Sequence, residues 1–533
     1  MVILLSFIAC SKENNKAPQR AQTNTPSYGD VFMDASLGDA SNLIPILASD
    51  TSSHDVAGLI YNGLVKYDKN FQIVPDLAER WDIEQDGKLI RFHLRKGVRW
   101  HDGQPLTAAD VLFTYRTVID PKTPTAYAGD FKQVKAVKLL DDYTIEVTYD
   151  TPFAPALISW GMSVLPEHLL KGKDITKSML ARQPVGTGPY VFKSWQPGSR
   201  IVLKANNDYF EGRPRLDGVV YRIIPDDATQ FLELKAGNID IKGLTPLQYL
   251  RQTSSPDFAA HFAKYKYLAD AYTFLGFNLT RPPFDDLKVR QAVAHAIDKE
   301  EIIKGVLFGQ GLATTGPYKP GTRWYNPYVP KYAYDPAKAR ALLAEAGFKD
   351  TNADGILEKN GRPFTFTITT NQGNPLREKT AQIIQQRLKY IGIDTKIRIV
   401  EWTVFLKEFV DPGNFDAVIL GWTITPDPDA FDVWHSSSIG PRKLNFVGFS
   451  NAEVDDLLDK ARHTFDEKAR KRYYDRFQVI LAQEQPYVFL YAPYALPAVS
   501  SRIKGIVPAP AGISYNFKDW YVPKARQKYS VVP

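Results

Sequence analysis

The chain has 533 residues, which is room for about three or four domains at roughly 150 residues each. A hydrophobic fraction of 44% and a charged fraction of 23% are typical of globular proteins and exclude wholesale disorder and collagen-like structure. The 66 basic and 59 acidic residues are mixed without a basic block, and there are only 8 histidines and 1 cysteine, so we expect no nucleic-acid binding, no disulfide scaffold, no metal site and no cofactor.

Residues 1–27 have the composition of an export signal followed by a flexible tether. Met1–Ala9 is apolar but too short to cross a membrane as a helix, Cys10 follows it, and the next residues are polar and include proline. The pattern resembles a bacterial lipoprotein signal, although no basic residue precedes the apolar run and Phe7 stands where such signals usually have leucine. The resemblance implies a lipidated Cys10 and work in the periplasm or at the cell surface. The alternative is a cysteine that is there by chance.

From Tyr28 onward, short strand-like runs alternate with amphipathic helical runs, which predicts an α/β protein. Strands are expected at 89–94, 134–139, 144–149, 200–204 and 219–224, and a hairpin turn at Asp141-Asp142. Helices are expected at 52–62, 108–119, 229–236, 288–297, 336–346, 376–391, 452–463 and 467–484. Thr107 stands where its hydroxyl can cap the 108–119 helix.

One stretch predicts a specific supersecondary unit. The alternating run at 364–369, the helix at 376–391 that stops at Gly392, and the strand at 394–400 follow one another directly. Strand, helix and strand over about thirty residues predict a βαβ unit with a parallel pair of strands.

Several longer strings are specific in combination. They include IRFHLRKGVRWHDGQPLTAADVLFTY (Ile90–Tyr115), PVGTGPY (Pro184–Tyr190) and LGFNLTRPPFDDLKVRQAVAHAID (Leu275–Asp298). The series resembles the family 5 extracellular solute-binding proteins, which are the dipeptide, oligopeptide and nickel receptors of ABC importers. The resemblance runs in order from about Ser36 to Tyr491.

The resemblance implies a periplasmic-binding-protein-like fold of class II with three lobes, the cluster C type. The expected lobes are a split lobe of residues 28–61, 185–275 and 491–533, an inserted lobe of residues 62–184, and a third lobe of residues 276–490. Two chain crossings, near Gly276–Asn278 and Phe489–Tyr491, would form the hinge. The ligand would lie between the split lobe and the third lobe, which close over it.

Two third-lobe strings are similar to oligopeptide receptors, in which two tryptophans line the side-chain pockets of the peptide. Those positions here are Trp402 and Trp422. An aspartate that pairs with the α-ammonium of the peptide is replaced by Thr425, which cannot offset the burial of an ammonium. Asp427 is the candidate substitute, and a neutral or differently anchored ligand is the alternative.

Other binding candidates are less specific. Asn371 aligns with an arginine that pins the ligand carboxylate in dipeptide receptors, and asparagine cannot match a carboxylate bidentately, so strict dipeptide specificity is not expected. Asn371 and Asn374 are candidates for ligand contact, with turn residues as the equally weighted alternative. The split lobe offers three further candidates, Tyr61, Thr187 and Gly188.

The expected function is that of a monomeric receptor that captures peptides, oligopeptides rather than strictly dipeptides, and delivers them to the permease subunits of an ABC importer. The chain has no ATPase motif of its own. An oligosaccharide receptor of the same family is one alternative. A secreted glycosidase is the alternative from another class, and it would need two cleft carboxylates about 5–10 Å apart. No catalytic residue is expected.

Overall fold

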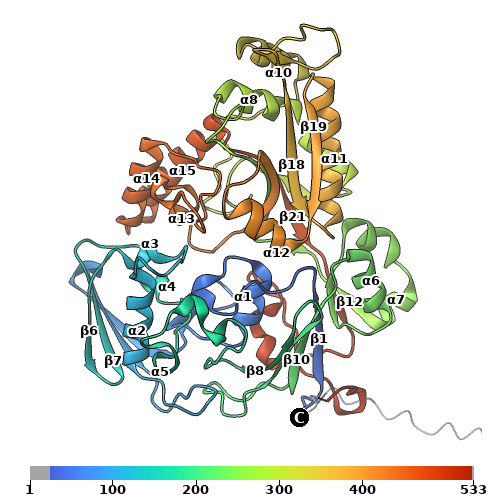
Figure 1. The fold of residues 1–533 in the computed structure, drawn as a ribbon. Helices are drawn as coiled ribbons and strands as arrows, with labels where there is room; N and C mark the ends of the chain where they lie inside the picture. The colour runs from blue at the N-terminus through green and yellow to red at the C-terminus, as the bar shows by residue number, and fades with distance from the viewer. Residues whose placement is uncertain (1–24, 531–533) are drawn as a thin grey trace, which may run out of the picture.

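The computed structural model describes residues 25–530, and these form two bodies, one above the other in Figure 1. The upper body is the third lobe, and the lower body holds the split lobe and the inserted lobe. Cys10 lies outside the described residues, as does most of the expected tether. None of the helices in residues 25–530 is both long and apolar enough to span a membrane.

The split lobe is built on a four-stranded sheet in the order β1-β10-β9-β8, in which only β1 and β10 are parallel. In a smaller sheet, the C-terminal strand β22 lies between β11 and β12 and pairs with both of them. The bounds are β1 Val31–Ser36, α1 Thr51–Ala57, β8 Tyr190–Gln196, β9 Arg200–Ala205, β10 Gly218–Ile223, α6 Asp227–Lys235, β11 Ile241–Gly243, α7 Pro256–His261, β12 Phe262–Lys264 and β22 Pro497–Ser500.

The inserted lobe carries an antiparallel sheet in the order β4-β5-β7-β6. Helix α2 has a capping box, because the side chain of Thr107 and that of Asp110 each accept from a backbone N–H at its first turn. The bounds are β2 Val65–Tyr67, β3 Ile73–Pro75, β4 Ala78–Glu84, β5 Leu89–Leu94, α2 Ala108–Ile119, α3 Ala128–Phe131, β6 Val134–Asp141, β7 Thr144–Tyr149, α4 Ala156–Ser159 and α5 Glu167–Leu170.

The third lobe is built on a sheet in the order β13-β21-β14-β20-β18-β19, with β15 also paired to β21. Its long helix α11 lies along the β18–β19 side of this sheet (Figure 1). The strand bounds are β13 Tyr267–Leu268, β14 Ala271–Phe277, β15 Gly311–Ala313, β16 Glu358–Lys359, β17 Arg362–Pro363, β18 Thr365–Asn371, β19 Asp394–Val400, β20 Ala417–Thr423 and β21 Tyr487–Ala495. The helix bounds are α8 Leu287–Ala296, α9 Lys299–Gly305, α10 Pro336–Glu345, α11 Pro375–Tyr390, α12 Trp402–Val404, α13 Phe431–Trp434, α14 Ala452–Arg462 and α15 Glu467–Glu484.

The buried cores show which lobes form one body. A single cluster of buried apolar residues joins the split lobe to the inserted lobe, with members such as Phe32, Val219, Phe92 and Trp160. The third lobe has two clusters of its own on the two faces of its sheet, represented by Phe366 and Phe489. Since cores are close-packed and resist deformation, we expect the split and inserted lobes to move together.

Most expected elements are present, and the βαβ unit is confirmed because β18 and β19 pair in parallel. The expected helix at 52–62 is too long, since α1 ends at Ala57. The carbonyls of Leu59 and Ile60 accept from the backbone N–H groups of Tyr190 and Gly188. Those tertiary bonds replace the helical ones that a longer helix would make.

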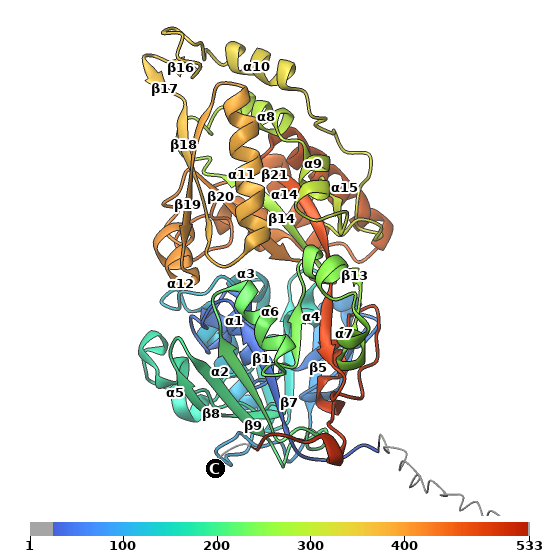
Figure 2. The same cartoon turned by 90° about the vertical axis from the view of Figure 1, so that its right-hand side faces the viewer.

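The two crossings between the bodies differ from the expected positions. The chain leaves the split lobe after β12 and enters the third-lobe sheet at β13, and it returns between β21 and β22. Figure 2 shows β13 at the waist of the molecule. Gly276 and the stretch 489–491 lie instead inside β14 and β21, because these apolar strands run on through the interior of the sheet.

Candidate functional site

A cavity of about 560 Å³ lies where the two bodies meet. The split lobe contributes α1 and its N-terminal side, and the inserted lobe contributes Tyr127. The third lobe contributes α12, the end of β20, the segment 423–434 and the segment 442–446. Every lobe therefore has side chains in its wall, and opening of the bodies would divide it.

The lower wall of the cavity is polar and includes titratable groups. The carboxylate of Asp50 caps α1, accepting from Ser53 N at 2.9 Å, and is thereby occupied. Burial, together with Asp50, raises the pKa of Asp55 to about 6. Burial also lowers the pKa of His54, whose Nε2 lies 3.1 Å from the hydroxyl of Tyr127. The wall thus offers carboxylate, imidazole and phenol groups to a ligand.

The upper wall holds both tryptophans that were expected in the ligand site. Trp402 begins α12, and its indole N–H is buried without a hydrogen-bond partner. Trp422 is the penultimate residue of β20, and its indole N–H donates to the hydroxyl of Tyr487 at 3.3 Å while its ring stacks on Phe446. Their ring faces give the cavity apolar walls for side chains of varied shape.

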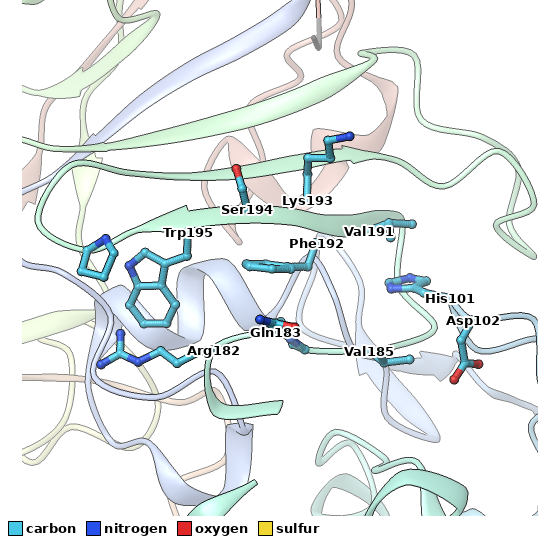
Figure 3. A pocket seen from close by; sticks show the side chains of 12 residues that line it. His101, Asp102, Arg182, Gln183, Val185, Val191, Phe192, Lys193, Ser194 and Trp195 are labelled. Atoms are coloured by element: carbon cyan, nitrogen blue, oxygen red, sulfur yellow. The ribbon is translucent and has the colours of Figure 1, made fainter. Parts of the chain in front are cut away.

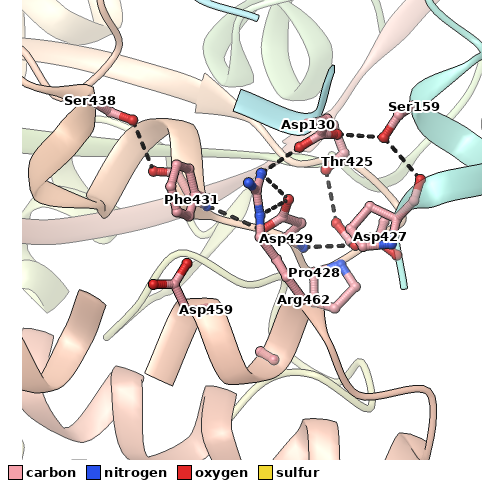
Figure 4. Close-up of polar contacts among 12 residues, drawn as sticks. Asp130, Ser159, Thr425, Asp427, Pro428, Asp429, Phe431, Ser438, Asp459 and Arg462 are labelled. Carbon is pink, nitrogen blue, oxygen red and sulfur yellow. Dashed lines mark hydrogen bonds and ion pairs between the residues drawn. The ribbon is translucent and has the colours of Figure 1, made fainter. Parts of the chain in front are cut away.

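The segment after β20 brings Thr425 and Asp427 to the cavity as well, and Figure 4 shows the contact between them. The side chain of Asp427 is already held by an arginine. Its two carboxylate oxygens accept from Arg470 at 2.9 and 3.1 Å. Thr425 donates to the backbone carbonyl of Asp427 at 2.9 Å. Because the guanidinium holds both oxygens, Asp427 is not available as the principal anchor of a ligand ammonium.

Beside this segment, another ion pair links the third lobe to the inserted lobe. Arg462 at the end of α14 has an exposed fraction of 1% and donates from Nε to Asp429 at 2.9 Å. Its Nη2 bonds both Asp429 and Asp130 of α3, and Ser159 donates to Asp130 from the other side (Figure 4). Burial and the nearby carboxylate of Asp429 raise the pKa of Asp130 to about 6, although Arg462 opposes the shift.

Asp432 on α13 is a further carboxylate of the cavity wall. It makes no hydrogen bond or ion pair with any other described residue, and a Cβ atom at Gly129 would lie 2.6 Å from its Oδ1. Burial, followed by the carboxylate of Asp130, raises the pKa of Asp432 to about 8. The neighbouring charges are Asp130, Asp429, Arg462 and Lys132, of which only the last two oppose that shift.

Close approaches across the boundary show that the bodies are in contact. A Cβ atom at Gly38 would lie 2.6 Å from Cδ1 of Trp402, and one at Gly373 would lie 2.0 Å from the carbonyl oxygen of Pro225. The backbone N–H of Ala154 also donates to the carbonyl of Arg462 at 2.6 Å. The arrangement is that of a closed cleft.

Asn371 and Asn374 do not line the cavity. The side-chain oxygen of Asn374 accepts from the N–H of Arg377 and caps α11, which is the turn role considered above. The oxygen of Asn371 accepts from Nη1 of Arg377 at 2.7 Å. The guanidinium of Arg377 therefore lies beside the position where the dipeptide receptors carry an arginine.

The three split-lobe candidates also lie away from the cavity, in the packing between the split and inserted lobes. Tyr61 is buried, and Thr187 is buried and donates to Asn62 Oδ1 at 3.0 Å. A Cβ atom at Gly188 would lie 2.6 Å from the carbonyl carbon of Ile60. Other residues enclose all three positions, so the structure does not support ligand contact at any of them.

Sequence reasoning missed the lower wall and Asp432. His54, Asp55 and Tyr127 carry no motif, and only the chain path brings them to the boundary. Asp432 follows the DPD string at 427–429 closely enough to have been considered. The sequence signal that could have pointed to Asp432 is the density of aspartates in that short segment.

A larger hollow of about 770 Å³ lies on the split and inserted lobes alone (Figure 3). Its lining includes exposed Arg182, stacked on Trp195, and His101. Burial lowers the pKa of His101 to about 4, and its Nε2 lies 3.0 Å from the carbonyl of Gly188, so this histidine is a neutral structural group. Because no third-lobe residue reaches this hollow, closure cannot enclose a ligand there. In residues 25–530, no three His, Cys, Asp or Glu side chains gather so as to hold a metal ion.

Comparison with known proteins shows similarity over nearly the whole chain. A family model described as bacterial extracellular solute-binding proteins, family 5 middle, matches residues 72–441. The chain is 35% identical to the oligopeptide-binding protein AppA of Bacillus subtilis, covering 98% of this chain and 97% of the relative. It is 32% identical to heme-binding protein A of Haemophilus influenzae, covering 95% of each.

Solved structures agree with this result. The structure of AppA from Bacillus subtilis in complex with a nonapeptide has a TM-score of 0.89 at 35% identity, covering 94% of this chain and 100% of that one. The periplasmic binding protein DppA of Helicobacter pylori, in complex with the peptide STSA, has a TM-score of 0.84 at 31% identity, covering 94% and 99%. The expected α/β fold of periplasmic-binding-protein type is therefore confirmed.

Proposed function

Because this chain belongs to the family 5 bacterial extracellular solute-binding proteins, we propose that it captures peptides outside the cytoplasm and delivers them to the permease subunits of an ABC importer. The observation that carries the proposal is the cavity enclosed between the third lobe and the lower body. It is lined by Trp402 and Trp422. Similar proteins are described as binding oligopeptides, and one is solved with a nonapeptide.

The mechanism that we propose is closure of the third lobe on the split and inserted lobes. A ligand contacts both bodies only in the closed state, so it shifts the population toward that state. The lobe boundaries that we propose follow the two crossings: about residues 28–61, 185–264 and 497–533 for the split lobe, 62–184 for the inserted lobe and 267–495 for the third lobe, in place of the expected boundaries at 275/276 and 490/491. The closure mechanism is supported by the contacts between the two bodies at Gly38, Gly373 and Arg462.

We assign roles only to residues in the cavity wall. Trp402 and Trp422 would line the pockets for peptide side chains, and Thr425 would offer a hydroxyl at the edge. An oligopeptide suits the site better than a strict dipeptide, because Asn371 holds Arg377 and does not face the cavity. We further propose that the chain acts as a monomer, releases its ligand unchanged, and is held at the membrane by a lipid on Cys10.

Native mass spectrometry of the purified chain tests the proposal. An enclosed ligand leaves slowly, so we expect a heterogeneous set of adducts at peptide masses, and lipid mass on Cys10 in protein extracted from membranes. A single adduct at a sugar mass would favour the oligosaccharide receptor instead. Turnover of glycoside substrates would favour the glycosidase. Peptide capture would be contradicted if the chain carried no adducts and no added peptide raised its melting temperature.

A further inference from the structure

The positive charge of the chain is concentrated in two segments of the sequence. Residues 497–533 hold six basic residues and one acidic residue, and residues 1–27 hold three basic residues and one acidic residue. Together these segments account for the whole formal charge of +7, so basic and acidic residues are equal in number between residues 28 and 496. A charge gathered in this way can create a local field, whereas the same excess spread over the whole chain cannot.

The fold brings the C-terminal part of this charge beside Tyr28, which directly follows residues 1–27. The side chain of Gln527 donates from Nε2 to the backbone carbonyl of Tyr28 at 2.9 Å. Lys524 and Lys528, which flank Gln527 in the sequence, are both exposed. The C-terminus lies at the end of the lower body that faces away from the third lobe (Figure 1). This cationic segment is therefore far from the ligand cavity.

Further cations surround Tyr28 from the split lobe. The residue has an exposed fraction of 54%, and the guanidinium carbons of Arg213 and Arg215 lie 4.9 and 5.6 Å from the centre of its ring. The backbone N–H of Arg215 donates to the carbonyl of Lys518 at 3.2 Å, which brings another cationic residue to the same place. We call this surface the basic end face, and its members are Tyr28, Arg213, Arg215, Lys518, Lys524 and Lys528.

The protein neutralises only part of the basic end face. Arg213 is paired with Asp217, and Nζ of Lys518 lies 3.6 Å from Oδ1 of Asp519. The other cations of the face have no acidic partner within 4.0 Å among residues 25–530, and these are Arg215, Lys524 and Lys528. The face therefore keeps an excess of positive charge around an exposed aromatic ring.

An anionic lipid surface has the chemistry that complements this face. Clustered lysines and arginines are attracted to anionic headgroups, and tyrosine favours the boundary between lipid and water. Cys10 precedes Ser27 by 17 residues, and a flexible segment of that length spans about 20–25 Å. A lipid on Cys10 would therefore keep the basic end face within reach of the headgroups.

We propose that the basic end face rests on the anionic headgroups of the membrane to which the chain is tethered. The inference rests on the extracytoplasmic, membrane-held position in the proposed function, and it is independent of what the cleft binds. Because the face lies at the far end of the lower body, this contact leaves the third lobe free to open and close (Figure 1). The attraction is electrostatic, so it is reversible and weakens as salt is added.

Vesicle flotation of the full chain with Cys10→Ser tests the contact, because this chain cannot carry a lipid. Vesicles of phosphatidylcholine alone are compared with vesicles in which phosphatidylglycerol replaces part of it. We expect about tenfold more chain on the anionic vesicles at low salt, and its release at high salt. Binding through the apolar residues 1–9 would appear equally on both kinds of vesicle.

Paired substitutions assign the attraction to the face. Lys524→Gln together with Lys528→Gln should weaken binding to anionic vesicles at least tenfold, because each cation near such a surface strengthens binding by about fivefold. Lys389→Gln together with Lys396→Gln removes the same charge from two exposed lysines of the third lobe, and we expect it to leave binding nearly unchanged. Melting curves verify that both variants fold.

Three results would overturn the inference. The first is equal binding to neutral and anionic vesicles, and the second is an equal loss in the third-lobe variant, which would make net charge the cause. The third is a loss confined to Lys12→Gln with Lys16→Gln, which would assign the attraction to residues 1–27. Peptide binding is measured on the same samples. Its absence, with vesicle binding through Lys524 and Lys528 intact, would contradict peptide capture and support the membrane contact.

Discussion

At the scale of single residues, the site is decided by which charges are already paired. Asp427 and Asp429 belong to one short string, yet each is fixed by an arginine from α14 or α15. Asp432, three residues beyond, has no such partner. Identical side chains in one segment therefore differ in their ion pairs, because the arginines approach from other elements.

The raised pKa of Asp432 predicts a pH dependence of stability. The folded chain keeps this proton up to about pH 8, whereas the unfolded chain releases it near the ordinary value of 3.8. The folded state binds more protons in that interval, so this group lowers the free energy of unfolding as the pH rises from about 4 to about 8. Asp432→Asn removes that loss, and we expect it to be more stable than wild type above pH 8 by on the order of 2 kcal/mol.

Urea unfolding of wild type and Asp432→Asn between pH 4 and pH 9 measures the difference, with Asp142→Asn as the control of equal chemistry at an exposed turn. The two stability curves should converge toward pH 4 and separate above it. Parallel curves would show that Asp432 titrates normally.

At the scale of elements, strings that are specific in sequence serve packing. The turn PVGTGPY (184–190) lies against the residues that follow α1, where the backbone N–H of Gly188 donates to the carbonyl of Ile60 at 2.7 Å. A side chain at Gly186 or Gly188 would collide with that backbone. Ile60 belongs to the core that the split lobe shares with the inserted lobe, so the turn helps to fasten these lobes to each other.

Gly188→Ala tests the structural role of this turn. The added Cβ would lie 2.6 Å from backbone atoms of Leu59 and Ile60, so we expect the free energy of unfolding to fall by about 1–3 kcal/mol. Gly243→Ala in β11 is the matched control, because a Cβ there meets nothing within 4 Å. Urea unfolding and peptide affinity are measured together. Lost affinity at unchanged stability would return Gly188 to the ligand site.

At the scale of the whole molecule, the two bodies have separate buried cores. The split and inserted lobes share one core, and the third lobe has its own. The bond from Arg462 to Asp130 is a buried ionic link between the bodies. When the bodies open, the bond between Arg462 and Asp130 breaks but Arg462 stays paired with Asp429. The free-energy cost of opening is therefore smaller than that of leaving a buried arginine with no partner.

Asp130→Asn should therefore shift the chain toward the open state. We expect a larger radius of gyration by small-angle X-ray scattering without ligand, and peptide affinity weaker by on the order of tenfold, since the closed state binds and is less populated. Asp456→Asn, which removes an exposed ion pair on α14, serves as the control. A radius and affinity equal to wild type would show that this link does not hold the bodies together.

Much of the fold follows from local sequence. The bounds of β5, α2 and α15 equal the expected ones, because hydrophobic periodicity and capping residues act within a few positions along the chain. The ordered series of family strings also identified the family, and with it the three-lobed plan and the two tryptophans that meet at the cavity.

The tertiary structure alone decided which polar residues are available to a ligand. Asp427 is engaged by Arg470, 43 residues further on, and Asn371 by Arg377. Tyr127 reaches the cavity only because the inserted lobe folds against α1. Such pairings depend on burial and on charges brought together from distant segments, and these act through space, where sequence spacing carries no information.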